Sequence, residues 1–209
     1  MKFLSLSAAA LLGFANLSLA GPLYAAPIIE HAAPKSVKCD AKNEECRTAK
    51  QAAPHIVQGL FDHGIYDVKE MAAVISLMAF ESGDFQYKRN KFPGRPGQGT
   101  ANMQMPQWNL LYAQSIPELK SKWGDVKTIE GMTNETLNAL LDDVVDDKYN
   151  FASGPWFLTT QCEPSVREAL RKDIDAGFKE YMDCVDVKID EGRLKALNLA
   201  KEAFGLKKC

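Results

Sequence analysis

The sequence predicts a mainly α fold, and three observations lead to this class. Residues 71–80 are apolar on nearly every face of a helix, which is typical of a helix in the middle of a core. Residues that start and stop helices recur along the chain. Strand-like alternation of apolar and polar residues is scarce. We therefore expect short helices joined by turns.

The first two expected helices have clear boundaries. Residues 49–63 are predicted to be helical, and Gly64 follows at the position where a left-handed backbone often ends a helix. Asp67 is the expected N-cap of the next helix, and Glu70 lies three residues later, a pattern like a capping box. This second helix is expected to run to about Ser82 and to form the centre of the core.

The stretch 84–105 differs in kind, because it is rich in proline and glycine and shows no helical or sustained strand period. A loop of this length inside a compact domain is uncommon and is usually functional. We therefore expect the functional site to include this long Gly/Pro-rich loop, which leaves room for a small β-hairpin.

Further helices are expected after the loop. Pro106, Pro117 and Pro155 can each occupy the first position of a helix. Thr133 is the expected N-cap of a helix that reaches Asp147. The last helical segments are expected at 165–181 and 190–204.

The first twenty residues are typical of an export signal. Lys2 precedes a short apolar core, and small residues end the segment before Gly21. We expect a signal peptide at 1–20, an extended segment at 21–47 and a single domain at 48–209. No later stretch is long and apolar enough to cross a bilayer, so we expect a soluble, secreted, extracellular protein.

Charge and composition exclude some classes of partner. The formal net charge is -2, with acids and bases interspersed, and 25% of the residues are charged. No basic stripe or RNA-binding signature is present, so nucleic acid is not an expected partner. A membrane is not expected either.

The cysteines predict two disulfides, since an oxidising compartment favours bridges. Cys39 and Cys46 are close in sequence and can close the N-terminal segment. Cys162 and Cys184 flank a helical stretch that would hold the two sulfurs far apart if it were straight. A break at 172–177 would turn this stretch into a helical hairpin and allow the pairing.

Cys209 is then left unpaired or joined to another chain. The chain has three histidines and lacks the CxxC and HExxH spacings of zinc sites. We therefore expect no metal and no other cofactor.

Glu81 is the leading candidate for a catalytic residue, because it ends the apolar run 71–80. A low-dielectric environment raises the pKa of a carboxyl group and lets it carry a proton near neutral pH. A general acid in glycoside cleavage has this requirement. Asp84 lies three residues later and is the candidate for a second carboxylate, although it can also simply end the helix.

Three elements of the chain resemble the lysozyme-like superfamily, specifically goose-type lysozymes and soluble lytic transglycosylases. Glu81-Ser82 matches their catalytic Glu-Ser motif at the end of a core helix, and 102–106 (Asn-Met-Gln-Met-Pro) matches their Gly-Leu-Met-Gln-like element. The segment 152–157 meets their Ala-Tyr-Asn-x-Gly motif only loosely, because it lacks Tyr-Asn. The chain is also similar to secreted fungal proteins with the same Glu-Ser and Met-Gln-Met-Pro features. The resemblance covers roughly 50–205.

This resemblance implies a lysozyme-like helical domain with a sugar-binding cleft that cleaves β-1,4 links in an amino-sugar polymer. Glu81 would be the general acid of a muramidase or lytic transglycosylase. The expected partner is a polysaccharide, with peptidoglycan favoured over chitin and chitosan, and the chain is expected to be a monomer. Core packing or a plain loop position is an alternative for several of the expected substrate-binding residues. These residues are Ser82, Tyr87, Asn102, Gln104, Trp108 and Trp156.

Two other functions stay open from the sequence. One is a non-catalytic secreted carbohydrate-binding or effector protein on the same scaffold, and the other is a chitosanase-type hydrolase with Asp84 or another acid as its base. Asn134 begins an Asn-Glu-Thr sequon and is a predicted glycosylation site.

Overall fold

Helix α3 (Val68–Glu81) is the centre of a mainly α fold, which confirms the predicted fold class. The computed structural model describes residues 21–206, so the predicted signal peptide at 1–20 and Cys209 lie outside the described residues. The other elements are α1 (Gly21–Ala32), η1 (Pro34–Val37), α2 (Ala49–Asp62), α4 (Pro106–Ser115), η2 (Pro117–Leu119), α5 (Lys120–Trp123), α6 (Asn134–Val144), α7 (Asp147–Asn150), α8 (Ser153–Thr160), α9 (Pro164–Lys172), α10 (Ile174–Cys184) and α11 (Glu191–Ala203).

Burial along α3 explains its central position. Every residue of 72–79 is buried, including Ser76, whose hydroxyl donates a hydrogen bond to the carbonyl oxygen of Ala73. Helix α3 packs against α1, α8, α9, α10 and α11. A helix that is apolar on every face is stable in water only when neighbours cover all of those faces.

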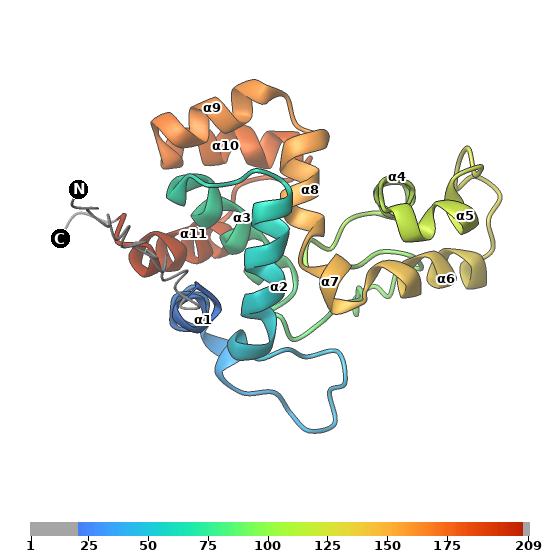
Figure 1. The fold of residues 1–209 in the computed structure, drawn as a ribbon, viewed down its shortest axis with the longest axis horizontal. Helices are drawn as coiled ribbons and strands as arrows, with labels where there is room; N and C mark the ends of the chain where they lie inside the picture. The colour runs from blue at the N-terminus through green and yellow to red at the C-terminus, as the bar shows by residue number, and fades with distance from the viewer. Residues whose placement is uncertain (1–20, 207–209) are drawn as a thin grey trace, which may run out of the picture.

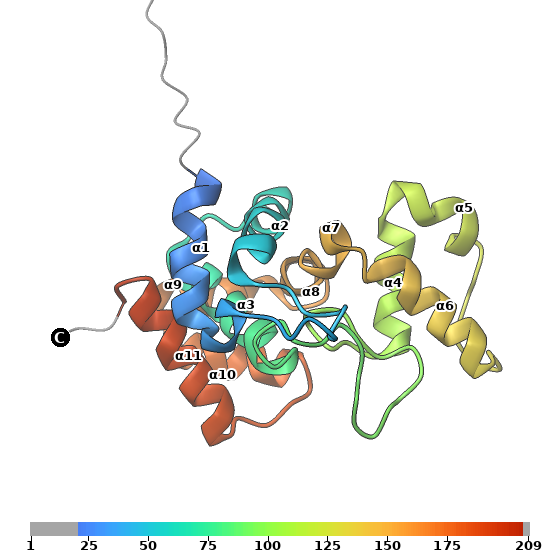
Figure 2. The ribbon, with the colours of Figure 1, turned by 90° about the horizontal axis from the view of Figure 1, so that it is seen from below.

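The remaining helices form a second group beside this core. Figure 1 shows α4, α5 and α6 together on the right, and the view from below in Figure 2 shows the same separation. Helix α4 contacts α5 and α6, whereas α7 contacts α2, and α8 contacts both α2 and α3. Helices α7 and α8 and the loop 82–105 therefore connect the two groups.

The expectation of an extended segment at 21–47 is wrong for its first part, because residues 21–32 form helix α1. Ala26, Ile29, Ala32 and Ala33 are buried, and α1 contacts α2, α3 and α11. These positions recur at the three- and four-residue spacing of one helix face. The prolines at 22 and 27 obscured this period in the sequence. Residues 21–32 thus belong to the same helical body as the rest of the chain.

The caps of α2 and α3 show how local sequence sets the start of each helix. Thr48 and Gln51 form a reciprocal capping box at the start of α2. The carboxylate of Asp67 accepts a hydrogen bond from the backbone N–H of Lys69, 2.8 Å away, and caps α3. Glu70 does not complete this cap, because its buried carboxylate pairs with Arg167 instead, at 2.6 Å.

Helices α9 and α10 form the hairpin that the disulfide prediction required. The helical stretch breaks at Asp173, whose carboxylate caps α10 by accepting from the backbone N–H groups of Asp175 and Ala176. Cys162 and Cys184 are thereby bonded, with Cα atoms 5.6 Å apart. Cys39 and Cys46 form the second bridge, with Cα atoms 5.7 Å apart.

The expected hairpin inside 84–105 is reduced to two isolated bridges, Arg89 with Gly99 and Gly99 with Gln104. A side chain at Gly99 would collide with the carbonyl oxygen of Lys88 and with Leu141. Glycine at this position therefore permits the close approach that holds the loop in shape.

Candidate functional site

A cleft of about 500 Å³ lies where the C-terminal end of α3 meets the loop. Leu77 and Glu81 come from α3, and Trp108 comes from the first turn of α4. Residues 102–105 form the wall on the loop side, and Phe157 of α8 and residues 184–187 complete it. The structure thus brings Glu81 into one cavity with the Met-Gln-Met segment.

Hydrogen bonds fix the orientation of two amide side chains on the loop wall, those of Gln98 and Gln104. Asn109 donates from Nδ2 to the backbone carbonyls of Gly97 and Gln104, so its Oδ1 is the acceptor. Gln104 therefore donates from Nε2 to that Oδ1, at 2.8 Å. In the same way Gln98 donates from Nε2 to the carbonyl oxygen of Met103, at 3.0 Å.

As a result, the amide oxygens of this wall are left without hydrogen-bond donors. Gln98 Oε1, Asn102 Oδ1 and Gln104 Oε1 are shielded from solvent and accept no hydrogen bond from the described part of the protein. A buried acceptor without a donor costs about 1–3 kcal/mol. The residues that carry these oxygens line the cleft, but the oxygens themselves are not exposed on its surface.

Glu81 on the opposite wall is paired. Its Oε1 accepts a hydrogen bond from Arg193 Nη2 of α11 at 2.7 Å. Arg193 also lies over the ring of Phe80, 4.5 Å from its centre, and donates from Nη1 to Asp190 at 2.6 Å. The side chain of Glu81 is only 20% exposed.

Burial is the largest influence on the pKa of Glu81 and raises it above the usual value, even though Arg193 acts in the opposite direction. The buried hydroxyl of Tyr181 has its pKa raised as well, by burial and by the negative charge of Glu81. Neither this hydroxyl nor Nε of Arg193 has a hydrogen-bond partner within residues 21–206.

Apolar side chains form much of the rest of the cleft, which Arg95, Gln107 and Asp186 also line. The rings of Trp108 and Phe157 meet edge to face, with centres 5.3 Å apart. Leu77, Val185 and Val187 add aliphatic surface. The Cys162–Cys184 bridge attaches the segment 184–187 to the end of α8, so it fixes this wall.

Two residues predicted for the site are elsewhere. Ser82 is buried and caps the end of α3: its hydroxyl donates to the carbonyl oxygen of Met78 at 2.6 Å and accepts from the N–H of Phe85. Asp84 accepts a hydrogen bond from the backbone N–H of Lys35 at 3.0 Å and does not line the cleft. The left-handed backbone at Gly83, Asp84 and Phe85 turns the chain away from the cleft.

Two of the predicted aromatic residues are also outside the cleft. Trp156 is 3% exposed and packs in the core against Tyr112, at 4.9 Å between ring centres. Tyr87 is exposed beyond the end of α3 and does not line the cleft. Asn102, Gln104 and Trp108 do line it. Asn134 is exposed at the start of α6, and its glycosylation stays a prediction.

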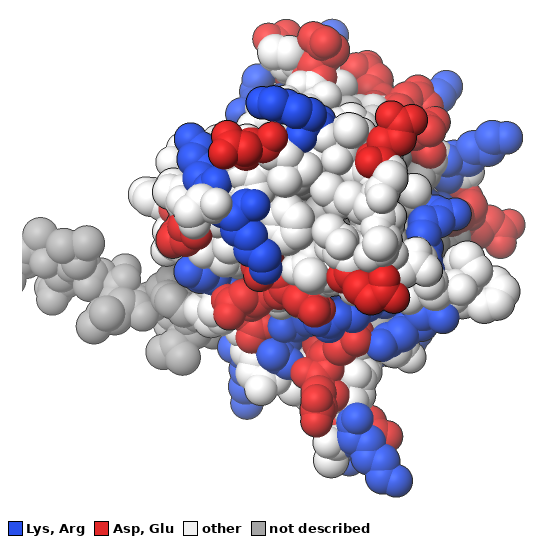
Figure 3. All heavy atoms as spheres, turned by 90° about the vertical axis from the view of Figure 1, so that its right-hand side faces the viewer, with Lys and Arg blue, Asp and Glu red and all other residues white. Residues whose placement is uncertain are grey.

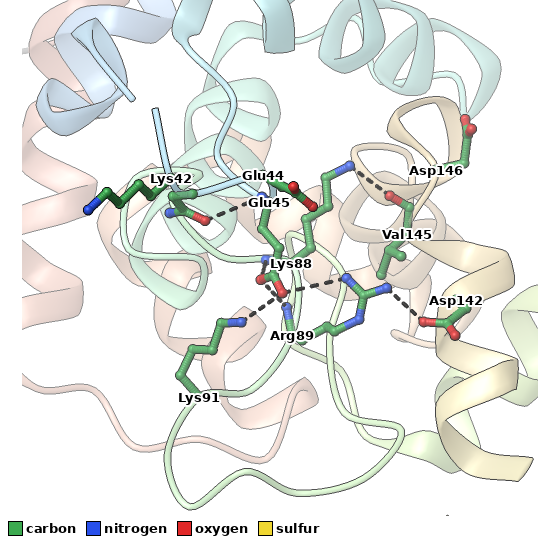
Figure 4. A pocket seen from close by; sticks show the side chains of 10 residues that line it. Lys42, Glu44, Glu45, Lys88, Arg89, Lys91, Asp142, Val145 and Asp146 are labelled. Atoms are coloured by element: carbon green, nitrogen blue, oxygen red, sulfur yellow. Dashed lines mark hydrogen bonds and ion pairs between the residues drawn. The ribbon is translucent and has the colours of Figure 1, made fainter. Parts of the chain in front are cut away.

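A second hollow of about 560 Å³ is lined mainly by charged side chains that are already paired (Figure 4). The carboxylate of Glu45 accepts from the backbone N–H groups of Lys88 and Arg89 and from Nζ of Lys91 at 2.7 Å. Arg89 continues to Asp142 of α6 at 2.7 Å. This hollow connects the Cys39–Cys46 loop to α6 through the 84–105 loop.

The surface on the right-hand side of Figure 1 shows no concentration of one charge. In Figure 3, acidic and basic side chains are interspersed around a central area of uncharged residues. Within the described chain, no helix is long and apolar enough to span a membrane. Residues 21–206 also contain no group of three or more His, Cys, Asp or Glu side chains placed to hold a metal ion.

Sequence reasoning missed several residues of the cleft. Arg193 contacts Glu81 although the two residues are 112 positions apart in the sequence, and no local sequence pattern predicts that contact. Val185 and Val187 follow the predicted hairpin just after Cys184. The predicted Cys162–Cys184 disulfide was therefore the one feature of the sequence that could have placed them near the end of α8. Arg95 and Gln98 lie in the loop that the sequence singled out as functional.

Comparison with known proteins gives one informative relative. The chain is 57% identical over 157 residues to a "Bifunctional dioxygenase (DOX)-epoxy alcohol synthase (EAS)" of Fusarium oxysporum (strain Fo5176). The match covers 75% of this chain but only 12% of that much longer protein. No protein-family model matches the chain. No solved structure matches it either.

This comparison corrects the predicted function. The relative is named for a dioxygenase and an epoxy alcohol synthase, which contradicts the prediction of a glycosidase, muramidase or lytic transglycosylase with Glu81 as its acid. The chitosanase and carbohydrate-binding or effector alternatives belonged to the same prediction and are corrected with it. The resemblance to the lysozyme-like superfamily, the polysaccharide partner and the monomeric state stay predictions.

Proposed function

We propose that this protein binds a small hydroxylated molecule with an apolar frame in the cleft at the end of α3, and that epoxy alcohols are the chemical class it takes. The observation that carries the proposal is a cleft with large apolar side chains in its lining and, on its loop side, residues whose amide oxygens lack donors. The relative's printed name supports the choice of class.

The apolar walls are the reason for proposing a ligand with an apolar frame. Trp108, Phe157 and Leu77 surround a cavity whose volume lies in the range of small-molecule sites. Burying 100 Å² of apolar ligand surface contributes about 2.5 kcal/mol before the costs of association. A ligand with a hydrocarbon segment can therefore gain most of its affinity from these walls.

The unpaired amide oxygens are the reason for proposing a hydroxyl group on the ligand. Asn102 Oδ1 and Gln104 Oε1 can only accept hydrogen bonds, and the orientation of Gln104 follows from its bond to Asn109. Both oxygens are shielded from solvent, so the proposal requires these two side chains to turn toward the ligand when it binds. A hydroxyl group donates one hydrogen bond, whereas a purely apolar ligand would leave these oxygens without a donor. Each such bond contributes roughly 0.5–1.5 kcal/mol.

The relative limits the proposal to binding. A match at 57% identity implies that the matched segment of the Fusarium protein has the same fold. Because the chain spans 12% of that protein, oxygenation and epoxy alcohol synthesis are activities of the relative as a whole. We propose that the matched segment supplies a binding site for a molecule of the product class.

We also propose that the protein is secreted. The apolar segment at 1–20 supports an export signal, and the two disulfides are compatible with an oxidising compartment.

Isothermal titration calorimetry on residues 21–209 tests the function. The probe is a medium-chain epoxy alcohol, and the comparison ligand is the corresponding epoxide without the hydroxyl. The epoxy alcohol is expected to bind about 5- to 10-fold more tightly, equivalent to one hydrogen bond. Asn102→Leu should remove this difference and leave the binding of the plain epoxide unchanged. Gln58→Leu, a change of an exposed amide on α2, is the matched control.

Three results would overturn the proposal. One is the absence of binding by either probe, and another is equal binding of the two probes by the unaltered protein. The third is binding of amino-sugar oligomers in the same cleft, detected by loss of their affinity in Asn102→Leu, without any binding of the epoxy alcohol.

A further inference from the structure

Arg95 differs from every other arginine between residues 21 and 206, because no carboxylate pairs with it. Its guanidinium donates from Nη1 to the sulfur of Met105 at 3.0 Å. Sulfur of a thioether is a weak acceptor, so most of the hydrogen-bonding capacity of this group is unused. The other arginines have carboxylate partners: Arg47 with Asp147, Arg89 with Asp142, Arg167 and Arg171 with Glu70, and Arg193 with Glu81.

The position of Arg95 is set by its surroundings. Asn90 Oδ1 accepts hydrogen bonds from the backbone N–H groups of Gly94 and Arg95, and Gln98 donates its backbone N–H to the carbonyl oxygen of Arg95. The contact with Met105 then directs the guanidinium along the loop wall of the cleft, which Arg95 lines. An unpaired cation thus lies on an exposed residue of a site that is otherwise apolar or rich in acceptors.

We propose that Arg95 binds a carboxylate at one end of the ligand, so that the cleft takes hydroxylated acids in preference to their neutral esters. This inference rests on the proposed function. A planar guanidinium offers paired N–H donors that match the two oxygens of a carboxylate.

The rest of the lining decides where the carboxylate goes. Asn102 and Gln104 carry unpaired, solvent-shielded acceptor oxygens, which suit a hydroxyl and not an anion once the side chains turn toward the ligand. Glu81 and Asp186 are acids that line the same cavity, and Glu81 is already paired with Arg193. The carboxylate is therefore placed at Arg95 and the hydroxyl at the amide oxygens, which fixes the direction of the ligand.

The test compares a medium-chain epoxy alcohol that ends in a carboxylate with its methyl ester, by calorimetry at low and at high salt. The unaltered protein is expected to bind the acid about 3- to 10-fold more tightly at low salt, since the guanidinium is exposed. This preference should shrink at high salt because exposed charges are screened.

Arg95→Gln should abolish the preference for the acid and leave the affinity for the ester unchanged. Lys91→Gln is the matched control, because it removes the same charge from the same loop while Lys91 pairs with Glu45 in the other hollow. Arg95→Lys should keep part of the preference.

The outcomes separate this inference from the proposed function. If the acid and the ester bind equally and Arg95→Gln changes neither affinity, the carboxylate site is wrong but the cleft remains a binding site. If Lys91→Gln lowers the preference as much as Arg95→Gln does, the effect is one of net charge and the inference is also wrong. If neither probe binds, the proposed function itself fails.

Discussion

Lys88 offers the sharpest test of how the loop is held against the helices. Its side chain is 9% exposed, and Nζ donates to Asp147 at 2.6 Å and to the carbonyl oxygen of Val145 at 2.9 Å. Lys88→Met keeps most of the apolar stem and removes the charge. We expect this change to lower the free energy of unfolding by about 2–4 kcal/mol.

The magnitude follows from what each partner loses. Removing one member of a buried ion pair costs roughly 3–5 kcal/mol when the other charge is left alone. Here Arg47 still bonds the carboxylate of Asp147 at 2.7 Å, which reduces this loss. The carbonyl of Val145 loses a donor, which adds part of the roughly 1–3 kcal/mol cost of an unsatisfied buried group.

Urea unfolding, monitored by circular dichroism, measures the change at a constant slope with respect to urea. Lys91→Met is the control: Lys91 is 52% exposed, so it is expected to cost at most about 1 kcal/mol. Equal losses for the two variants would refute the reasoning, because burial would then make no difference to the value of the pair.

The effect of Lys88→Met also depends on pH. Burial alone would raise the pKa of Asp147, but hydrogen bonds and attraction from Lys88 and Arg47 outweigh it and hold the pKa below its usual value. A depressed carboxyl pKa stabilises the fold above the pKa of the unfolded chain, and this contribution is lost as pH falls through the folded pKa. The difference between the variant and the unaltered protein should therefore shrink in acid.

Two further changes test the cleft walls. Burial raises the pKa of Glu81 above its ordinary value, so the charged form is disfavoured in the folded protein. The unaltered protein should therefore lose stability relative to Glu81→Gln as pH rises through that raised pKa. Urea unfolding at several pH values measures this, and a Glu81→Gln variant that instead loses stability relative to the unaltered protein as pH rises would contradict it. The Cys162→Ala/Cys184→Ala double variant should lose about 3 kcal/mol, because the bridge spans a sequence separation of 22, and an unchanged melting temperature under oxidising conditions would refute that estimate.

The sequence predicted the helices best where a cap and an apolar face coincide. Helix α3 has both, with Asp67 at its start and an unbroken apolar run behind it. Helix α1 has an apolar face but includes Pro27 and lacks an acid in its first turn, so nothing local marked it as a helix. Its stability comes from packing against α2 and α11, with Ile29 buried, and such contacts are not visible in a local pattern.

The site was predicted in part, and the physical reason lies in the backbone after α3. Glu81, Asn102, Gln104 and Trp108 meet because a core helix and the following loop end at the same place. Asp84 was grouped with Glu81 on sequence distance alone. Three consecutive residues with a left-handed backbone, beginning at Gly83, turn the chain after Glu81. Of the three, only the glycine is a residue type that predicts such a turn.

The chemistry of the cleft was harder to predict than its location. An acid at the end of an apolar helix suggested a proton donor, but Arg193 supplies a partner that only the folded chain brings to it. Likewise, the orientation of Gln104 depends on a chain of hydrogen bonds that ends on the backbone carbonyl of Gly97. That chain leaves amide oxygens rather than N–H groups unpaired, and this is why we propose a ligand that brings a hydroxyl donor rather than an anion to this wall.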